Sequence, residues 1–133
     1  KRGYKLFKRK KKTGRINSRK TVALGIEFDS KTEAEYYLFL KSNPEVVGIE
    51  LQPQYMLLEG FYITTREGKR KKRRDWKFTA DFLVTYKDGT QEVIDVKGYA
   101  NDRFPYMKKM FEYRYKQELV VVMKDKQKGW IRK

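Results

Sequence analysis

A chain of 133 residues is long enough for one domain with a hydrophobic core, and 39% hydrophobic and 15% aromatic residues argue against disorder throughout. The chain contains no cysteine and no histidine, which excludes disulfides, thiolate metal sites, histidine-based triads and most zinc sites. Its 33 Lys and Arg against 17 Asp and Glu give a net charge of +16, which indicates a polyanionic partner such as DNA or RNA.

The start of the chain is its most basic part. Residues 1–20 hold 11 Lys and Arg and no acid, without apolar periodicity. We therefore expect a flexible basic arm over 1–20 and a single folded domain over 21–133. The chain begins with Lys1 rather than methionine, so its natural start is expected to lie upstream. No apolar run approaches membrane-spanning length and no secretory signal is visible, which favours a cytoplasmic protein without membrane contact.

A helix is expected to begin at Ser30. This residue is a good N-cap, and Glu33 follows it at the spacing of a capping box. Apolar residues then recur at roughly helical intervals until Asn43-Pro44 ends the helix. The segment 46–58 has the composition of a strand, in which Pro53 limits pairing at the centre of a sheet.

The remaining elements are mostly strands. The clearest is a β-hairpin with strands over 76–86 and 90–97, preceded by a polar, basic loop over 66–74. This order of helix, strands, helix and strand favours a mixed sheet flanked by helices. The other expected elements are a turn at 59–60, a returning strand at 61–65, a helix at 104–117 and a buried strand at 119–123.

The turn of this hairpin decides which residues face each other across it. A two-residue turn at Asp88-Gly89 would set Asp81 and Asp95 on opposite faces. A three-residue loop over 87–89, closed by glycine in the left-handed region, would set the two aspartates directly opposite each other. The second register also gives one wholly apolar face, which is why we favour it. That face comprises Ala80, Phe82, Val84, Ile94 and Val96.

Asp81 and Asp95 then form a candidate metal site. Opposed residues place their Cβ atoms about 4.5–5.5 Å apart, and two carboxylates at this spacing both stay ionised only with a cation between them. Oxygen ligands without nitrogen or sulfur favour a hard ion, of which Mg²⁺ is the natural one. Lys97 lies on the same face, where it could orient a metal-bound water or stabilise phosphate charge. The alternative is a surface-facing pair of aspartates with a lysine salt bridge.

These residues resemble the signature of the PD-(D/E)XK nuclease superfamily. Asp81, followed across a hairpin by Asp95-Val96-Lys97, has the order of that signature, with aspartate in place of the commoner glutamate. The chain is similar to small phage-type endonucleases from about residue 25 to residue 123. The resembling segments also include the opening helix at 28–37, Leu51-Gln52-Pro53 and the aromatic helix at 111–115.

The resemblance implies a fold and a reaction. The fold is a restriction-endonuclease-like α/β/α core, with a central mixed β-sheet flanked by helices. Asp81, Asp95 and the carbonyl of Val96 would hold Mg²⁺, with Mn²⁺ as a substitute. Lys97 would act on the water that hydrolyses a phosphodiester bond in line.

The resemblance also implies a helix glutamate that completes the site. Glu33 has the better spacing, although the same spacing suits a helix cap. Glu35 is the alternative, with ordinary solvent exposure as its other interpretation. Gln52 is a candidate polar group in the cleft, or it only completes a strand edge.

The relatives of this shape include Holliday-junction resolvases. The resemblance therefore implies a structure-selective DNA endonuclease of DNA recombination, acting in the host cytoplasm if a phage encodes it. Two symmetric cuts in a junction would require a twofold homodimer. The alternatives are a nuclease of flaps, ends or single strands, and a non-catalytic nucleic-acid-binding module on the same fold. The choice between DNA and RNA, and between one and two metal ions, stays open.

Basic side chains are expected to hold the phosphate backbone without reading sequence. Some aromatic residues are candidates for stacking on unpaired bases, with core packing as the alternative. The aromatic candidates are Trp76, Tyr99, Phe104 and Tyr106. The basic candidates are Arg19, Lys20, Lys31, Arg70, Lys71, Lys72, Arg73, Arg74, Lys108 and Lys109.

Overall fold

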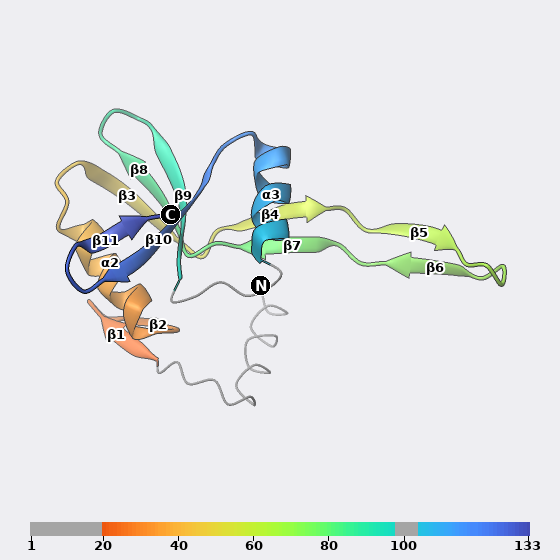
Figure 1. Ribbon diagram of the computed structural model, residues 1–133, viewed down its shortest axis with the longest axis horizontal. Coiled ribbons are helices and arrows are strands. Elements are labelled where there is room, and N and C mark those ends of the chain that lie inside the picture. The colour runs from red at the N-terminus through yellow and green to blue at the C-terminus, as the bar shows by residue number, and fades with distance from the viewer. Residues whose placement is uncertain (1–19, 98–103) are drawn as a thin grey trace. The chain divides into compact units, whose positions relative to one another are not determined.

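The computed structural model describes residues 20–97 and 104–133 (Figure 1). The chain divides into two compact units, Lys1–Leu38 and Phe39–Lys133, and each is described by itself. The described residues form two helices, one mixed five-stranded sheet and three two-stranded sheets. The predicted combination of helices with a mixed sheet is confirmed. No described helix is long and apolar enough to span a membrane.

The elements of the two units follow in chain order. The first unit contains β1 (Thr21–Ala23), β2 (Ile26–Phe28) and most of α2 (Lys31–Lys41). The second unit contains β3 (Val46–Leu51), β4 (Gln54–Leu58), β5 (Phe61–Thr64), β6 (Arg70–Arg73), β7 (Trp76–Thr79), β8 (Phe82–Tyr86), β9 (Gln91–Val96), α3 (Phe104–Tyr115), β10 (Leu119–Asp125) and β11 (Gly129–Arg132).

The first unit is a short hairpin followed by a capped helix. Strands β1 and β2 pair antiparallel, with Thr21 opposite Phe28. The Ser30 hydroxyl accepts the backbone N–H of Glu33 at 3.1 Å, which confirms the predicted N-cap of α2. The ring of Phe28 lies 5.1 Å from that of Tyr37, so the hairpin packs on the helix that it precedes.

The five-stranded sheet of the second unit has the order β11-β10-β9-β8-β3. Strands β9 and β10 run parallel, and the other neighbouring pairs run antiparallel. A parallel pair needs a crossover, and α3 supplies it between β9 and β10. Strand β9 lies at the centre of this sheet, so a charged residue on it can be kept from water on both sides.

One face of the sheet packs against α3 through a cluster of buried apolar residues. Phe111 of α3 is fully buried, and the ring of Tyr55 meets it edge-on at 5.1 Å. The cluster comprises Leu57, Phe78, Ala80, Val93, Phe104, Phe111, Leu119 and Val121. The other face carries Phe82, Val84, Ile94, Val96, Val120 and Val122, and all six are buried as well. Burial on both faces explains the continuous apolar run at 119–122, where the predicted buried strand is confirmed.

Two predicted long strands are each broken in the middle. The segment 46–58 divides at Gln52-Pro53, and the segment 76–86 divides at Ala80-Asp81. The breaks are joined, because the Gln52 N–H donates to the Asp81 carbonyl and the Ala80 N–H donates to the Pro53 carbonyl, both at 3.0 Å. Both strands thus leave the five-stranded sheet together, and β4 continues as the partner of β7.

The predicted apolar face is therefore wrong at one position. Ala80 does not share a face with Phe82 and Val84; it packs in the cluster that contains Val93 and Phe111. Strict alternation fails at this residue because the chain turns from one sheet into the next between β7 and β8.

The predicted basic loop over 66–74 is also wrong. Arg70–Arg73 is strand β6, which pairs antiparallel with β5, and a turn over 65–69 connects them. Figure 1 shows β5 and β6 extending the two-stranded path of β4 and β7 away from α3. We call residues 61–73 the β5–β6 ribbon. Apolar periodicity could not predict β6 because all four of its residues are basic.

The chain end contains a strand that the sequence did not predict. Strand β10 continues past residue 123 to Asp125, and β11 returns along it with Asp125 opposite Gly129. Trp130 of β11 lies 6.3 Å from the ring of Phe39, the first residue of the second unit. A polar composition over the last ten residues concealed this edge strand.

Candidate active site

The β8–β9 hairpin places two carboxylates opposite each other. The Tyr86 N–H donates to the Thr90 carbonyl at 2.9 Å, and Gly89 closes the loop with a φ of 88°. This is the three-residue loop, and the ladder runs down to Phe82 opposite Ile94. The next step sets Asp81 opposite Asp95, so the predicted register is confirmed.

The carboxylate of each aspartate accepts a hydrogen bond from a backbone N–H on the opposite side of the hairpin. An Asp95 carboxylate oxygen accepts the backbone N–H of Asp81 at 3.2 Å. The Asp81 Oδ2 atom accepts the backbone N–H of Val96 at 2.8 Å. These reciprocal bonds fix the direction of both carboxylates with rigid backbone donors. They also hold the end of β9 against the irregular Ala80-Asp81 step, where the regular ladder stops.

Lys97 completes what we call the acid–lysine cluster, made of Asp81, Asp95 and Lys97. Its Nζ atom lies 2.7 Å from Asp95 Oδ2 and 4.4 Å from the ring centre of Phe104. Asp95 is only 3% exposed, and among the described residues no other charged residue is as deeply buried. Buried charges persist only with close partners, and Asp95 has Lys97 as well as the Asp81 N–H.

The backbone around the cluster is anchored at both ends. The Lys97 N–H donates to the Val122 carbonyl of the neighbouring parallel strand at 2.9 Å. Gln52 holds a left-handed conformation, with a φ of 52°, and its N–H donates to Asp81. The structure thus links Gln52 to the site through its backbone, and a role for its side chain stays a prediction.

The helix acids belong to the first unit. Glu33 lies in the first turn of α2, where its N–H is capped by Ser30. Glu35 lies one residue beyond, and Lys31 Nζ is 4.0 Å from its carboxylate. Both glutamates are half-buried. The choice between them as the acid that completes the site stays a prediction.

The donor chemistry of the cluster suits a hard cation. Asp81 and Asp95 offer carboxylate oxygens from two adjacent strands, and Mg²⁺ takes oxygen ligands, often from one or two carboxylates. An ionised carboxylate has about four lone-pair sites, so accepting a hydrogen bond does not prevent it from binding a cation. Within residues 20–97 and 104–133, no three acidic side chains gather in one place.

A family model described as "Protein of unknown function (DUF1064)" matches residues 10–128. The chain belongs to the DUF1064 family. The matched part of this DUF1064 chain contains the whole acid–lysine cluster and the β5–β6 ribbon. No curated protein and no solved structure matches it.

The basic residues predicted to bind nucleic acid have different environments in this DUF1064 protein. Lys20 lies 3.6 Å from Asp29, and Lys108 Nζ lies 2.6 Å from Glu112. Lys109 is exposed on α3. Arg19 lies outside the described residues. The run 70–74 is exposed throughout, and its first four residues form strand β6.

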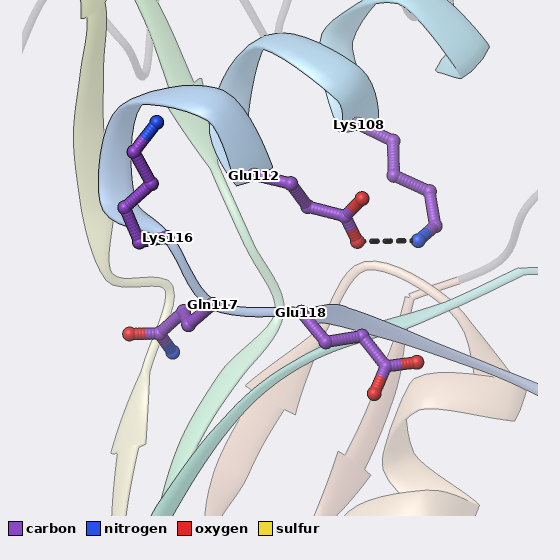
Figure 2. A pocket seen from close by; sticks show the side chains of 5 residues that line it. All are labelled: Lys108, Glu112, Lys116, Gln117 and Glu118. Carbon is purple, nitrogen blue, oxygen red and sulfur yellow. Dashed lines mark hydrogen bonds and ion pairs between the residues drawn. The ribbon is translucent and has the colours of Figure 1, made fainter.

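Lys108 has a structural role at the end of α3. Figure 2 shows its ammonium directed at the Glu112 carboxylate, beside Lys116, Gln117 and Glu118. The same Glu112 oxygen accepts the N–H of Leu119 at 3.0 Å, which ties the end of α3 to the start of β10. The bond from Lys108, followed by that from Leu119, holds the pKa of Glu112 below its ordinary value. The hollow beside these residues is thus a helix-to-strand junction.

The aromatic residues predicted as candidates for base stacking differ in their exposure. For Phe104 the sequence left base stacking and core packing open; it is buried in the core and contacts Lys97. Trp76 is partly buried against the same core. Tyr106 is 72% exposed and stays a candidate. Tyr99 lies outside the described residues. The prediction missed Tyr62, whose ring is exposed on β5 beside the cations of β6; the β-forming residues at 61–64 were its signal.

Proposed function

We propose that this DUF1064 protein is a Mg²⁺-dependent DNA endonuclease, with a restriction-endonuclease-like fold, that cuts branched DNA as a homodimer. The observation that carries the proposal is the acid–lysine cluster. Two aspartates lie opposite each other where the β8–β9 ladder ends, one of them on the central strand of the mixed sheet, and this one holds a lysine at 2.7 Å. The order Asp81, Asp95, Lys97 follows the signature that the sequence resembles.

A purely structural role accounts poorly for this arrangement. A buried ion pair is often no more stabilising than apolar residues of similar volume, because removing two charges from water is costly. Here a second carboxylate is added beside the pair, which increases that cost. The two carboxylates accept the backbone N–H groups of Asp81 and Val96, but uncharged acceptors could do the same, so these bonds do not require two ionised side chains. A bound cation would offset the mutual repulsion of the two carboxylates and the cost of their removal from water.

Each residue of the cluster would have a separate task. Asp81 and Asp95 would hold Mg²⁺, together with the Val96 carbonyl and Glu33 or Glu35. When bound, Mg²⁺ would polarise the scissile phosphate and activate a water. The Lys97 ammonium has three N–H donors. One is held by Asp95, and the others can orient the attacking water or stabilise the charge that develops on a phosphate oxygen.

The fold supports the same proposal at a coarser level. The β8–β9 hairpin is followed by a helical crossover to a parallel strand, with an earlier helix in the chain. This order is the one expected for an α/β/α nuclease core. A homodimer would give the two symmetric cuts that resolution of a four-way junction needs.

The test is a cleavage assay on four DNA substrates: a four-way junction, a flap, a linear duplex and a single strand. We expect Mg²⁺-dependent cleavage that EDTA abolishes and that Mn²⁺ also supports. Lys97→Ala should lower the rate by roughly 100-fold or more, the loss typical of a donor that stabilises transition-state charge. Lys87→Ala, in the exposed turn of the same hairpin, is the matched control and should change the rate less than twofold.

Each part of the proposal has its own contrary result. No Mg²⁺-dependent product from any substrate would overturn the enzyme and leave a binding module. Paired symmetric cuts in the junction would support resolution, whereas cuts in flaps or single strands alone would assign a different nuclease. A monomer mass by light scattering under conditions of active junction cutting would overturn the homodimer. Thermal melts of each variant should first show that it is folded.

A further inference from the structure

The β5–β6 ribbon is an exposed element with an unusual surface. Its strands form a sheet of two that extends away from α3 of the same unit (Figure 1). Phe61 and Tyr62 are 43% and 53% exposed, and every residue of β6 is exposed. A lone two-stranded hairpin is marginally stable in water. An exposed hairpin that the core does not stabilise is best explained by a binding partner that covers it.

The charge of the ribbon identifies the kind of partner. Residues 61–73 hold six Lys and Arg and a single acid, Glu67. Within the described residues, no carboxylate forms an ion pair with any residue of β6. The cations are thus available to phosphates. Such an edge also repels a second copy of itself, which argues against sheet extension between two chains.

The cations are distributed over both faces of the ribbon. Successive residues of a strand point to opposite faces, and the register pairs Tyr62 with Lys72 on one face and Ile63 with Lys71 on the other. On the face of Tyr62, the aromatic ring packs under the Arg70 guanidinium, which lies 4.3 Å from the ring centre. An element that rests on one side of a duplex needs cations on one face only. Cations on both faces suit an element enclosed between two phosphate backbones.

The dimensions agree with a groove of B-form DNA. Sheets stack about 10 Å apart, so one ribbon with its side chains is about that thick. The major groove of B-DNA is about 12 Å wide and admits a two-stranded ribbon. The major groove of A-form RNA is deep and too narrow for side chains to read. The fit therefore favours duplex DNA over duplex RNA.

The ribbon is joined firmly to the core. The Gly60 N–H donates to Asp75 Oδ1 at 2.7 Å, across the step where β4 and β7 give way to β5 and β6. Glu59, at the same step, forms an ion pair with both terminal nitrogens of Arg114 on α3. Strand β7 then leads to Asp81 two residues beyond its end. The ribbon is thus preorganised at a fixed base, which lowers the cost of ordering it on binding.

We propose that the β5–β6 ribbon is a duplex-binding arm that enters the major groove of B-form DNA and holds the duplex for the acid–lysine cluster. That the duplex is held for cleavage at the acid–lysine cluster rests on the proposed function. The grip itself requires no cleavage, so binding measured in EDTA tests the arm independently of the enzyme.

The experiment measures fluorescence anisotropy of the full chain in EDTA with a labelled DNA duplex of 24 base pairs, the RNA duplex of the same sequence, and the single DNA strand. Two variants each remove two charges from one face: Arg70→Gln with Lys72→Gln, and Lys71→Gln with Arg73→Gln. The matched control is Lys126→Gln with Lys128→Gln, two exposed lysines of the β10–β11 hairpin. Thermal melts should show that all three are folded.

The expected result is specific to the DNA duplex. Each phosphate contact contributes about 0.9 to the slope of log K against log salt, which corresponds to roughly fivefold in affinity at 0.15 M salt. Each ribbon variant should therefore bind the DNA duplex about 30-fold more weakly, with a slope smaller by about 1.8. The control should change binding less than threefold. The wild-type preference for the DNA duplex over the RNA duplex should shrink in both ribbon variants.

Three results would overturn the arm. Ribbon variants that bind like the control would exclude the ribbon as a contact. A loss confined to one face would show that the ribbon lies on a surface rather than in a groove. Equal losses on RNA duplex or single-stranded DNA would show a general phosphate grip without groove recognition. If cleavage fails in every assay but the DNA-specific loss is found, the enzyme is wrong and the arm stands.

Discussion

The acid–lysine cluster and the β5–β6 ribbon both consist of charged residues, but they differ in burial and in how firmly their side chains are fixed. In the acid–lysine cluster, Asp95 is almost wholly buried, and hydrogen bonds from the backbone fix both carboxylates. In the β5–β6 ribbon, four consecutive cations project into solvent, and an aromatic ring is the neighbour of two of them. Charges that are buried at a cost of several kcal/mol must be held in one direction. Exposed charges carry no such cost and can adapt to a phosphate backbone.

The difference suits two different tasks. Chemistry on a phosphodiester needs groups held in register with the reacting atoms. A grip on the backbone needs charge density and tolerates mobile side chains. The paired breaks at Gln52-Pro53 and Ala80-Asp81 allow one pair of strands to provide both, because the same strands pass from the buried sheet into the ribbon.

The largest expected effect is on stability, from Asp95→Ala. This change leaves the Lys97 ammonium, whose side chain is 23% exposed, without its partner at 2.7 Å. Removing one partner of a buried pair costs about 3–5 kcal/mol, and we expect a loss near the lower end because Lys97 is partly exposed. Urea unfolding followed by circular dichroism gives the free energy of unfolding.

The double variant Asp95→Ala with Lys97→Met provides the internal control. It removes both charges, so we expect it to recover more than half of the loss. The ribbon provides the contrast, because Arg70→Gln with Lys72→Gln should change stability by no more than about 0.5 kcal/mol. A loss under about 1 kcal/mol in Asp95→Ala would show that the cluster is no more constrained than the surface.

The same contrast explains what could be predicted from the sequence. The register of the hairpin was predictable because Lys87-Asp88-Gly89 sets the loop and the apolar alternation sets the faces. Strand β6 was not predictable, because an exposed basic strand has no apolar pattern and its pairing with β5 is a backbone property. The break at Asp81 was hidden for a related reason: residues 76–86 keep a strand-like composition while changing partners.

A smaller effect is expected from Gly60→Ala, at the junction of the two regions. A Cβ atom there would lie 2.9 Å from the Arg73 carbonyl oxygen and 2.9 Å from Asp75 Oδ1, so backbone must shift. Overpacking of this kind costs about 1–3 kcal/mol. Gly48→Ala in β3 is the matched control, because its Cβ would meet Thr85 at an ordinary 3.5 Å. If Gly60→Ala unfolds like Gly48→Ala in urea, the ribbon is hinged rather than fixed at its base.

The smallest effect concerns Glu92, which is intermediate between the two regions. It lies on β9 three residues before Asp95, but its side chain is 28% exposed, and both terminal nitrogens of Arg132 donate to it at 2.7 and 2.9 Å. The bonds from Arg132, and then from Tyr86, hold the pKa of Glu92 below its ordinary value of 4.5. A carboxyl whose folded pKa is depressed contributes stability above its unfolded pKa and loses it as the pH falls through the folded value.

Glu92→Gln should therefore destabilise the protein by no more than about 1 kcal/mol at pH 7, given the partial exposure of the pair. The difference in free energy of unfolding between variant and wild type should narrow as the pH falls below 4.5. There the wild-type carboxylate becomes protonated and is then as neutral as the glutamine. Urea unfolding at intervals between pH 7 and pH 3 measures this convergence. A constant difference across that range would mean that the pair acts by packing, and would place Glu92 with the exposed charges rather than with Asp95.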